Sequence, residues 1–289
     1  MSAGKKFREA IPSQGALPIL GVVNAYAAKL AEHAGAKVLY CSGAGVANAS
    51  FGLPDLAMTS LKEVLEDVQR IVSATHLPLL VDIDTGFGSV LNIERTVKEM
   101  EKAGVAAVHI EDQPFVKRCG HRDGKSVVSQ AVMVDRIHAA VNARQHSDFV
   151  IMARTDALAV ESIEQVIERI LAYVESGADM IFLEAVRQFS DLEQVVKATS
   201  VPILVNSTEF GKTPIYPFQT WAAHGAKMVL YPLSAFRAMS KAALDVYQTI
   251  LNTGTQESVL VHMQTRQELY DVLNYEQYEQ ALLKIHGEE

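Results

Sequence analysis

The sequence predicts an α/β fold in which eight parallel strands close into a (β/α)8 barrel. Short apolar runs recur through the chain, amphipathic helical patterns separate them, and a recurring glycine signal precedes several runs. The runs are rich in Val, Ile and Leu and do not alternate with polar residues, which is typical of strands covered on both faces. The expected strands are Ile19–Asn24, Val38–Ser42, Leu79–Asp84, Ala106–Glu111, Phe149–Thr155, Met180–Glu184, Ile203–Asn206 and Met228–Tyr231.

Helices are expected between these runs, where apolar residues recur at spacings of three and four. The clearest patterns are Ser60–Val72, Leu91–Ala103, Ser162–Glu175 and Leu192–Ala198. Gly35, Gly104, Gly177 and Gly225 each lie just before an apolar run, as glycine does when it ends a helix in the left-handed conformation. Pro78 and Pro202 stop a helix and open a strand. A doubly wound open sheet is the competing interpretation.

The chain contains more helix than a barrel needs. After Ser240 it is helical and rich in tyrosine, with Tyr247, Tyr270, Tyr275 and Tyr278. No low-complexity tract or Pro/Gly/Ser-rich linker divides the sequence. We therefore expect one barrel domain over residues 1–289, with a C-terminal helical arm over about 240–289.

Composition excludes several classes of protein. Asp and Glu number 34 against 26 Lys and Arg, and this net charge of −8 argues against binding to nucleic acid or anionic membranes. No apolar run approaches the roughly 18 residues of a membrane span. Two cysteines are too few for a disulfide framework. Without a visible signal peptide, the sequence indicates a cytoplasmic enzyme acting on a small molecule.

Catalytic residues of such barrels gather where the strands end. Asp82 and Asp84 lie two apart in an expected strand, so their carboxylates are predicted to share one face. Two such carboxylates repel unless a cation lies between them, and Mg²⁺ prefers oxygen ligands. Glu111, from the next strand, could complete the site. The alternative is that one aspartate caps a helix and the other pairs with an arginine.

Other strand ends carry groups that suit an anionic substrate. Arg154, Arg237 and Arg266 could grip carboxylates in bidentate pairs, or could be surface salt-bridge partners. Ser42-Gly43-Ala44-Gly45 offers backbone N–H groups to an anion, but lacks the spacing of a dinucleotide fingerprint. Asn206-Ser207-Thr208 could add neutral donors or only turn hydrogen bonds.

One loop suggests a reactive thiol. In Lys117-Arg118-Cys119-Gly120-His121, basic side chains surround the cysteine, and cations favour a thiolate. Gly120 and Gly124 suggest a loop that could act as an active-site lid. Cys41 lies in an apolar run and is most simply a core residue.

This loop resembles the signature loop of the isocitrate lyase and phosphoenolpyruvate mutase superfamily. Asp82-Ile83-Asp84-Thr85-Gly86-Phe87-Gly88 and Gly52-Leu53-Pro54-Asp55 are similar to two more of its motifs, and the resemblance covers essentially the whole chain. Lacking the large insertion of true isocitrate lyases, the chain is most similar to the 2-methylisocitrate lyase branch. That branch cleaves its substrate to pyruvate and succinate with Mg²⁺ in the methylcitrate cycle of propionate catabolism. Its members are homotetramers of barrels that exchange a C-terminal helix.

The resemblance implies a role for each matching residue. Asp82 and Asp84 match the magnesium-site aspartates, and Glu111 would bind Mg²⁺ through water. Cys119 would be the general acid, aided by Lys117 and His121, while Tyr40 and Asp55 are both candidates for the base. The positions that match substrate contacts are Ser42, Gly43, Ala44, Gly120, Arg154, Glu184, Asn206, Ser207, Thr208, Arg237 and Arg266, with Phe182 and Leu230 beside the substrate's extra methyl group. Many relatives have glycine at Ala44, which weakens that match.

Two alternatives to the lyase remain. A phosphonopyruvate hydrolase or oxaloacetate decarboxylase of the same superfamily would share the metal site but would not require Cys119. A non-catalytic binding barrel would have no reason to carry a ring of polar groups at its strand ends.

Overall fold

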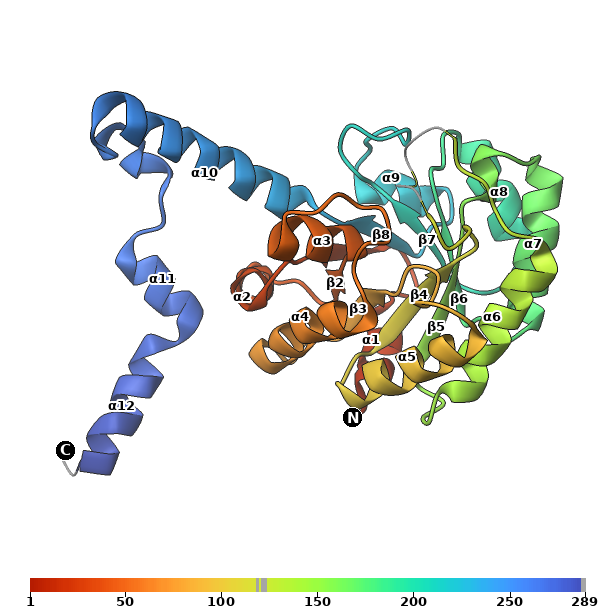
Figure 1. The fold of residues 1–289 in the computed structure, drawn as a ribbon, viewed down its shortest axis with the longest axis horizontal. Coiled ribbons are helices and arrows are strands. Elements are labelled where there is room, and N and C mark those ends of the chain that lie inside the picture. The colour runs from red at the N-terminus through yellow and green to blue at the C-terminus, as the bar shows by residue number, and fades with distance from the viewer. Residues whose placement is uncertain (118–119, 121–123, 287–289) are drawn as a thin grey trace.

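Eight parallel strands form a closed barrel with helices around it (Figure 1), in a computed structural model that describes residues 1–117, 120 and 124–286. Each strand pairs with the next in sequence, and β1 pairs with β8 to close the barrel. The strands are β1 (Leu17–Gly21), β2 (Leu39–Cys41), β3 (Leu79–Asp82), β4 (Ala107–Glu111), β5 (Val150–Thr155), β6 (Met180–Leu183), β7 (Ile203–Asn206) and β8 (Met228–Tyr231). This confirms the predicted barrel and excludes the open sheet.

The expected strands differ from the observed ones mainly at their ends. β1 covers Leu17–Gly21 rather than Ile19–Asn24, because Asn24 caps the following helix and accepts a hydrogen bond from the Ala27 N–H at 2.8 Å. β3 ends at Asp82, and Asp84 adopts a left-handed conformation with φ 49°. The prediction that Asp82 and Asp84 share a strand face is therefore wrong.

The helices have the predicted order and similar ends. They are α1 (Ala3–Ala10), α2 (Ala25–His33), α3 (Gly43–Phe51), α4 (Leu61–Ala74), α5 (Val90–Lys102), α6 (Gln130–Ala143), α7 (Ile163–Glu175), α8 (Phe189–Ala198), α9 (Phe218–Ala223), α10 (Ser234–Thr253), α11 (Arg266–Leu273) and α12 (Tyr275–His286), with short 3₁₀ turns at Ala157–Ala159 and Glu257–His262. Gly35 and Gly104, with φ 91° and 88°, take the left-handed conformation predicted where a helix gives way to a strand.

Two apolar layers hold the barrel together. The outer layer lies between the strands and the surrounding helices. The inner layer fills the barrel and includes Ile19, Met152 and Phe182. Phe7 of α1 is fully buried in this inner layer, so α1 closes the end of the barrel where the strands begin. A cavity lies at the opposite end, where the strands terminate.

The last helices leave the barrel. In Figure 1, α10 points away from the strands, and α11 and α12 follow it beside the barrel. α10 has no buried residue along its whole length, and Leu251 is 84% exposed. The arm returns to the barrel through the Tyr26 hydroxyl, which donates to Gln264 Oε1 at 2.8 Å. In the part of the chain described, no helix is both long and apolar enough to cross a membrane.

Candidate active site

A cavity of about 220 Å³ opens at the end of the barrel where the strands terminate. Most of the predicted site residues line it, although they come from all parts of the chain. They are Tyr40, Ser42, Ala44, Asp55, Asp82, Lys117, Gly120, Arg154, Phe182, Glu184, Asn206, Thr208, Leu230 and Arg237. The closed barrel explains this convergence, because it brings all eight strand ends into one ring.

Asp82 and Asp84 meet beside the first residue of α3 rather than on one strand face. The Gly43 N–H donates to Asp82 Oδ2 at 3.1 Å, and the Asp84 N–H donates to Asp82 Oδ1 at 2.9 Å. A Cβ placed on Gly43 would lie 3.1 Å from Asp84 Oδ1 and 3.2 Å from Asp82 Oδ2. Because Gly43 has no side chain, a small space remains beside the two buried carboxylates.

Lys117 supplies a positive charge to these acids. Its Nζ lies 2.6 Å from Asp55 Oδ1 and 2.7 Å from Asp84 Oδ1, and its side chain is only 4% exposed. Burial opposes the charged form, but the carboxylates of Asp84, Glu111, Asp55 and Asp82 outweigh it and raise the pKa of Lys117 well above its usual value. Lys117 is therefore a fixed cation in the site.

The two aspartates differ in acidity. Burial raises the pKa of Asp84 to about 6, and the neighbouring Asp82 charge adds to this while Lys117 opposes it. Burial also acts on Asp82, but His109, Lys117 and Arg154 outweigh it and hold the pKa of Asp82 below its usual value. Of the two groups, Asp82 is therefore the more stable anion.

Tyr40 and His109 form a buried polar pair beside Asp82. The Tyr40 hydroxyl lies 2.9 Å from His109 Nε2 and donates to Asp82 Oδ2 at 3.4 Å. Burial lowers the pKa of His109 to about 4 and raises the pKa of Tyr40 well above its usual value. Both side chains are thus neutral at physiological pH.

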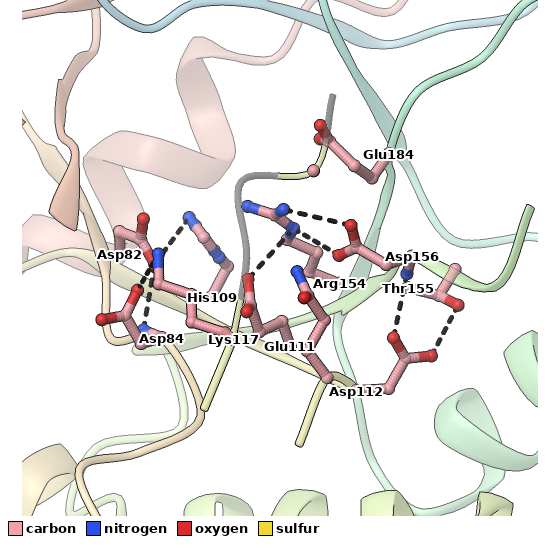
Figure 2. Close-up of polar contacts among 12 residues, drawn as sticks. Asp82, Asp84, His109, Glu111, Asp112, Lys117, Arg154, Thr155, Asp156 and Glu184 are labelled. Atoms are coloured by element: carbon pink, nitrogen blue, oxygen red, sulfur yellow. Dashed lines mark hydrogen bonds and ion pairs between the residues drawn. The ribbon is translucent and has the colours of Figure 1, made fainter. Parts of the chain in front are cut away.

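Arg154 connects the acids on the other side of the cavity (Figure 2). Its Nε lies 2.9 Å from Asp156 Oδ2 and 3.3 Å from Glu111 Oε2, and its guanidinium lies over the Phe182 ring at 5.1 Å. Glu111 Oε1 and Oε2 are buried and have no hydrogen-bond partner among the described residues, and burial raises the pKa of Glu111 well above its usual value. In this arrangement the described residues contain no group of three or more His, Cys, Asp or Glu that could hold a metal ion.

Arg237 stands at the mouth of the cavity and is half exposed. Its Nε lies 3.6 Å from Glu209 Oε2, and its guanidinium lies 5.9 Å from the centre of the Phe210 ring. The cavity therefore combines three cations, the acids Asp55, Asp82 and Glu184, and an apolar wall that includes Phe182 and Leu230. Such a set suits a small molecule with several carboxylates and a short apolar group.

The chain matches the phosphoenolpyruvate phosphomutase family over residues 7–251. The chain belongs to this family. It is 56% identical to 2-methylisocitrate lyase of Vibrio cholerae, over 98% of this chain and 94% of that protein. The structure of 2,3-dimethylmalate lyase, a member of the phosphoenolpyruvate mutase/isocitrate lyase superfamily, is similar with a TM-score of 0.89 and 32% identity, covering 97% of this chain and 94% of that one. The structure of phosphonopyruvate hydrolase in complex with oxalate and Mg²⁺ is also similar, with a TM-score of 0.85 and 29% identity, covering 98% of this chain and 99% of that one.

Some predicted residues of this family member lie elsewhere. Arg266 is the first residue of α11 in the arm and does not line the cavity within one chain. Ser207 is buried beside the cavity without lining it. Cys119 and His121 lie outside the described residues.

The structure adds residues that the sequence analysis did not select. His109 contacts Tyr40, while Glu209 and Phe210 stand beside Arg237. His109 could have been found, because it precedes Glu111 by two in a strand and so points to the same side. Glu209 and Phe210 follow β7 in an irregular loop, where no periodic signal exists.

Proposed function

We propose that the protein is a lyase that cleaves 2-methylisocitrate to pyruvate and succinate in the methylcitrate cycle. The observation that carries the proposal is the 56% identity to a 2-methylisocitrate lyase over almost the whole chain, together with a cavity lined by the matching residues.

The cavity offers a complement to this substrate, which has three carboxylates and one methyl group. Arg154 and Arg237, which both line the cavity, would pair with carboxylates. Phe182 and Leu230 would contact the methyl group. One methyl contact contributes about 1–3 kcal/mol, so isocitrate would be a poorer substrate but not an excluded one.

Two carboxylates can hold a magnesium ion that keeps several of its waters, so the residues present fit this ion without a third direct ligand among the described residues. Two carboxylate oxygens, from Asp82 and Asp84, approach the space that a Gly43 side chain would fill, and the carboxylate oxygens of Glu111 lack hydrogen-bond partners among the described residues. Asp82 and Asp84 would hold Mg²⁺, with Glu111 acting through water. The related phosphonopyruvate hydrolase was solved with oxalate and Mg²⁺. When bound, the ion supplies Lewis-acid stabilisation to the substrate oxygens.

The reaction is a retro-aldol cleavage of Claisen type. A base removes the proton of the substrate hydroxyl, the oxygen forms the keto group of pyruvate, and the carbon–carbon bond breaks toward the succinate fragment. Asp55 is the proposed base, because burial raises the pKa of the Tyr40 phenol well above its usual value and the phenol would have to ionise next to Asp82. Lys117 holds the Asp55 carboxylate in place at 2.6 Å.

The succinate fragment leaves as a doubly charged aci-carboxylate and must accept a proton at carbon. Cys119 would donate it, and this role rests on the sequence motif, since the residue lies outside the described part of the chain. Gly120, the next residue in the chain, lines the cavity, which supports this role.

An assay of pyruvate release tests the proposal. Purified protein is given 2-methylisocitrate, isocitrate or oxaloacetate, each with Mg²⁺ and with EDTA. We expect the highest kcat/KM with 2-methylisocitrate and loss of activity in EDTA. A preference for oxaloacetate, or full activity in EDTA, would contradict the proposal.

A further inference from the structure

A buried lysine that the sequence analysis did not select lies directly behind the candidate site. Lys125 precedes α6, and its side chain is 1% exposed. Its Nζ lies 2.8 Å from Asp156 Oδ1, which is also fully buried, and donates to the Gly120 carbonyl oxygen at 2.5 Å. One ammonium group thus joins two segments of the chain.

The first contact leads to Arg154. Asp156 accepts from Arg154 Nε at 2.9 Å with one carboxylate oxygen, and the oxygen bound to Lys125 lies 3.4 Å from an Arg154 terminal nitrogen. The Asp156 N–H in turn donates to Asp112 Oδ1 at 2.9 Å (Figure 2). Asp156 is therefore held from three sides and orients the guanidinium toward the cavity.

The second contact leads to the same arginine from the other direction. Gly120 lies so close to the site that a Cβ on it would be 2.3 Å from Glu184 Oε1 and 2.7 Å from Arg154 Nη2. Lys125 holds the carbonyl group of this residue. Both contacts of the ammonium thus end at Arg154, one through Asp156 and one through the Gly120 backbone.

We propose that Lys125 is a positioning residue for the lyase reaction, which orients Arg154 through Asp156 and holds the Gly120 backbone against Arg154 and Glu184. The inference rests on the proposed function and deepens it. It does not require Lys125 to touch the substrate, and Lys125 does not line the cavity.

A purely structural Lys–Asp pair is the alternative. Burying two charges is expensive, and apolar residues often replace such a pair without loss of stability. A Lys–Asp pair that served folding alone could make the same hydrogen bonds, because an ammonium group has three donors, so only kinetics that depend on Arg154 separate the two roles. Misplacing a substrate-binding group by about 1 Å can cost on the order of 100-fold in rate.

The test compares wild type with Lys125→Met, which has a similar length but no charge. We expect kcat for 2-methylisocitrate to fall about 10- to 100-fold. A measured thermal midpoint shows that the variant is folded. Lys227→Met is the matched control: Lys227 Nζ donates to the Ser13 carbonyl oxygen at 2.9 Å, just before β8 at the far end of the barrel. We expect it to keep wild-type kcat.

A double-variant cycle separates positioning from stability. If Lys125 acts through Arg154, Lys125→Met combined with Arg154→Lys should be about as active as Arg154→Lys alone. A structural role predicts that the two losses in kcat multiply. The inference is overturned if folded Lys125→Met keeps kcat within twofold of wild type, or if the losses multiply.

Lys125→Arg provides the measurement if Lys125→Met does not fold. The arginine keeps a positive charge for Asp156. Its donors are spread over a rigid plane, however, so no single nitrogen can take the place of the ammonium that reaches both Asp156 and the Gly120 carbonyl oxygen. We expect the protein to fold with a kcat about 3- to 10-fold lower, and an unchanged kcat would overturn the inference.

Failure of the proposed function would look different. In that case wild type releases no pyruvate, and the comparison is made on oxalate binding with Mg²⁺ by calorimetry. Lys125→Met and Arg154→Lys should then each weaken binding and should not do so additively, whereas equal affinity of Lys125→Met and wild type would refute the positioning role.

Discussion

Single side chains in the cavity are held by charges from distant parts of the sequence. Asp84 would be costly to bury alone, and Lys117 compensates it at 2.7 Å. Glu111 has Arg154 at 3.3 Å as its cationic neighbour. Because each buried acid depends on a cation, removing one member leaves an unpaired charge rather than a neutral gap.

The first prediction concerns the proposed metal. Asp82→Ala removes one of the two carboxylates beside Gly43. We expect Mg²⁺ binding to weaken. We expect kcat to fall by about 100-fold or more, because the bound ion that would stabilise negative charge in the transition state is lost. Calorimetry with Mg²⁺ and steady-state kinetics measure the two effects.

Asp135→Ala is the control for this variant, since Asp135 is an exposed aspartate of α6. It should match wild type in both measurements. If Asp82→Ala turns over 2-methylisocitrate at the wild-type rate in EDTA, the metal mechanism is wrong.

The second prediction concerns the proposed acid. Cys119→Ser replaces a thiol, whose ordinary pKa is about 8.5, with a far weaker acid. Loss of a general acid costs on the order of 10²–10⁴ in rate, so kcat at saturating substrate should fall by that factor. Binding of Mg²⁺ and pyruvate, measured by calorimetry, should persist because neither requires the thiol. A serine variant within about threefold of wild type would make Cys119 a bystander.

At the scale of elements, the turn from β2 into α3 builds one wall of the site. Ser42 is the N-cap residue, and α3 begins at Gly43. The sequence suggested that this segment offers its N–H groups to a bound anion. The Gly43 N–H donates to Asp82, so the helix start orients a side chain of β3. Anion binding by the other N–H groups of the segment stays a prediction.

The third prediction follows from this contact. Gly43→Ala would place a methyl group 3.1 and 3.2 Å from oxygens of Asp84 and Asp82. We expect Mg²⁺ affinity to fall on the order of 10- to 100-fold, as when a group supporting a metal ligand is disturbed. Calorimetric titration with Mg²⁺ measures it.

Gly45→Ala is the matched control in the same helix. The nearest neighbours of its Cβ would be the Leu233, Ser42 and Val23 side chains at 3.3–3.4 Å. It should lower the thermal midpoint while leaving Mg²⁺ affinity unchanged. Equal Mg²⁺ affinities of Gly43→Ala and wild type would mean that the space beside Gly43 is not the metal site.

At the scale of the whole molecule, the arm is the feature that one chain does not explain. α10 buries none of its residues, and Leu251 and Val261 are 84% and 83% exposed. We propose that the arm is exchanged between subunits of a homotetramer, because apolar surface of this extent needs a partner to cover it. The arm carries Arg266, which does not reach the cavity of its own chain.

The fourth prediction is an assembly of four chains. Light scattering at micromolar concentration should give the mass of a tetramer, and Leu251→Asp should shift it toward smaller species because a charge enters an apolar contact. Asn252→Asp, at the next exposed position of α10, is the control and should leave the mass unchanged. A monomer with the arm intact would rule out exchange.

Local sequence patterns predicted most of the fold. Non-alternating apolar runs, helical spacing and the glycines before strands depend on neighbouring residues, so they are visible without the structure. The ends of β1 and β3 were misplaced because Asn24 and Asp84 belong to the loops that leave the strands. A polar residue at the end of an apolar run can continue the strand or begin the turn, and the sequence does not distinguish the two.

The sequence by itself determined the barrel, the end at which the cavity opens and most residues that line it, since strand order alone brings strand ends together. The tertiary structure decided which side chains pair. Lys117 reaches Asp55 across 62 positions, and Tyr40 reaches His109 across 69. Lys125 reaches Asp156 across 31 positions, behind the cavity. Such pairs depend on the paths of loops and on which rotamers fit a buried space, and neither leaves a periodic trace in the chain.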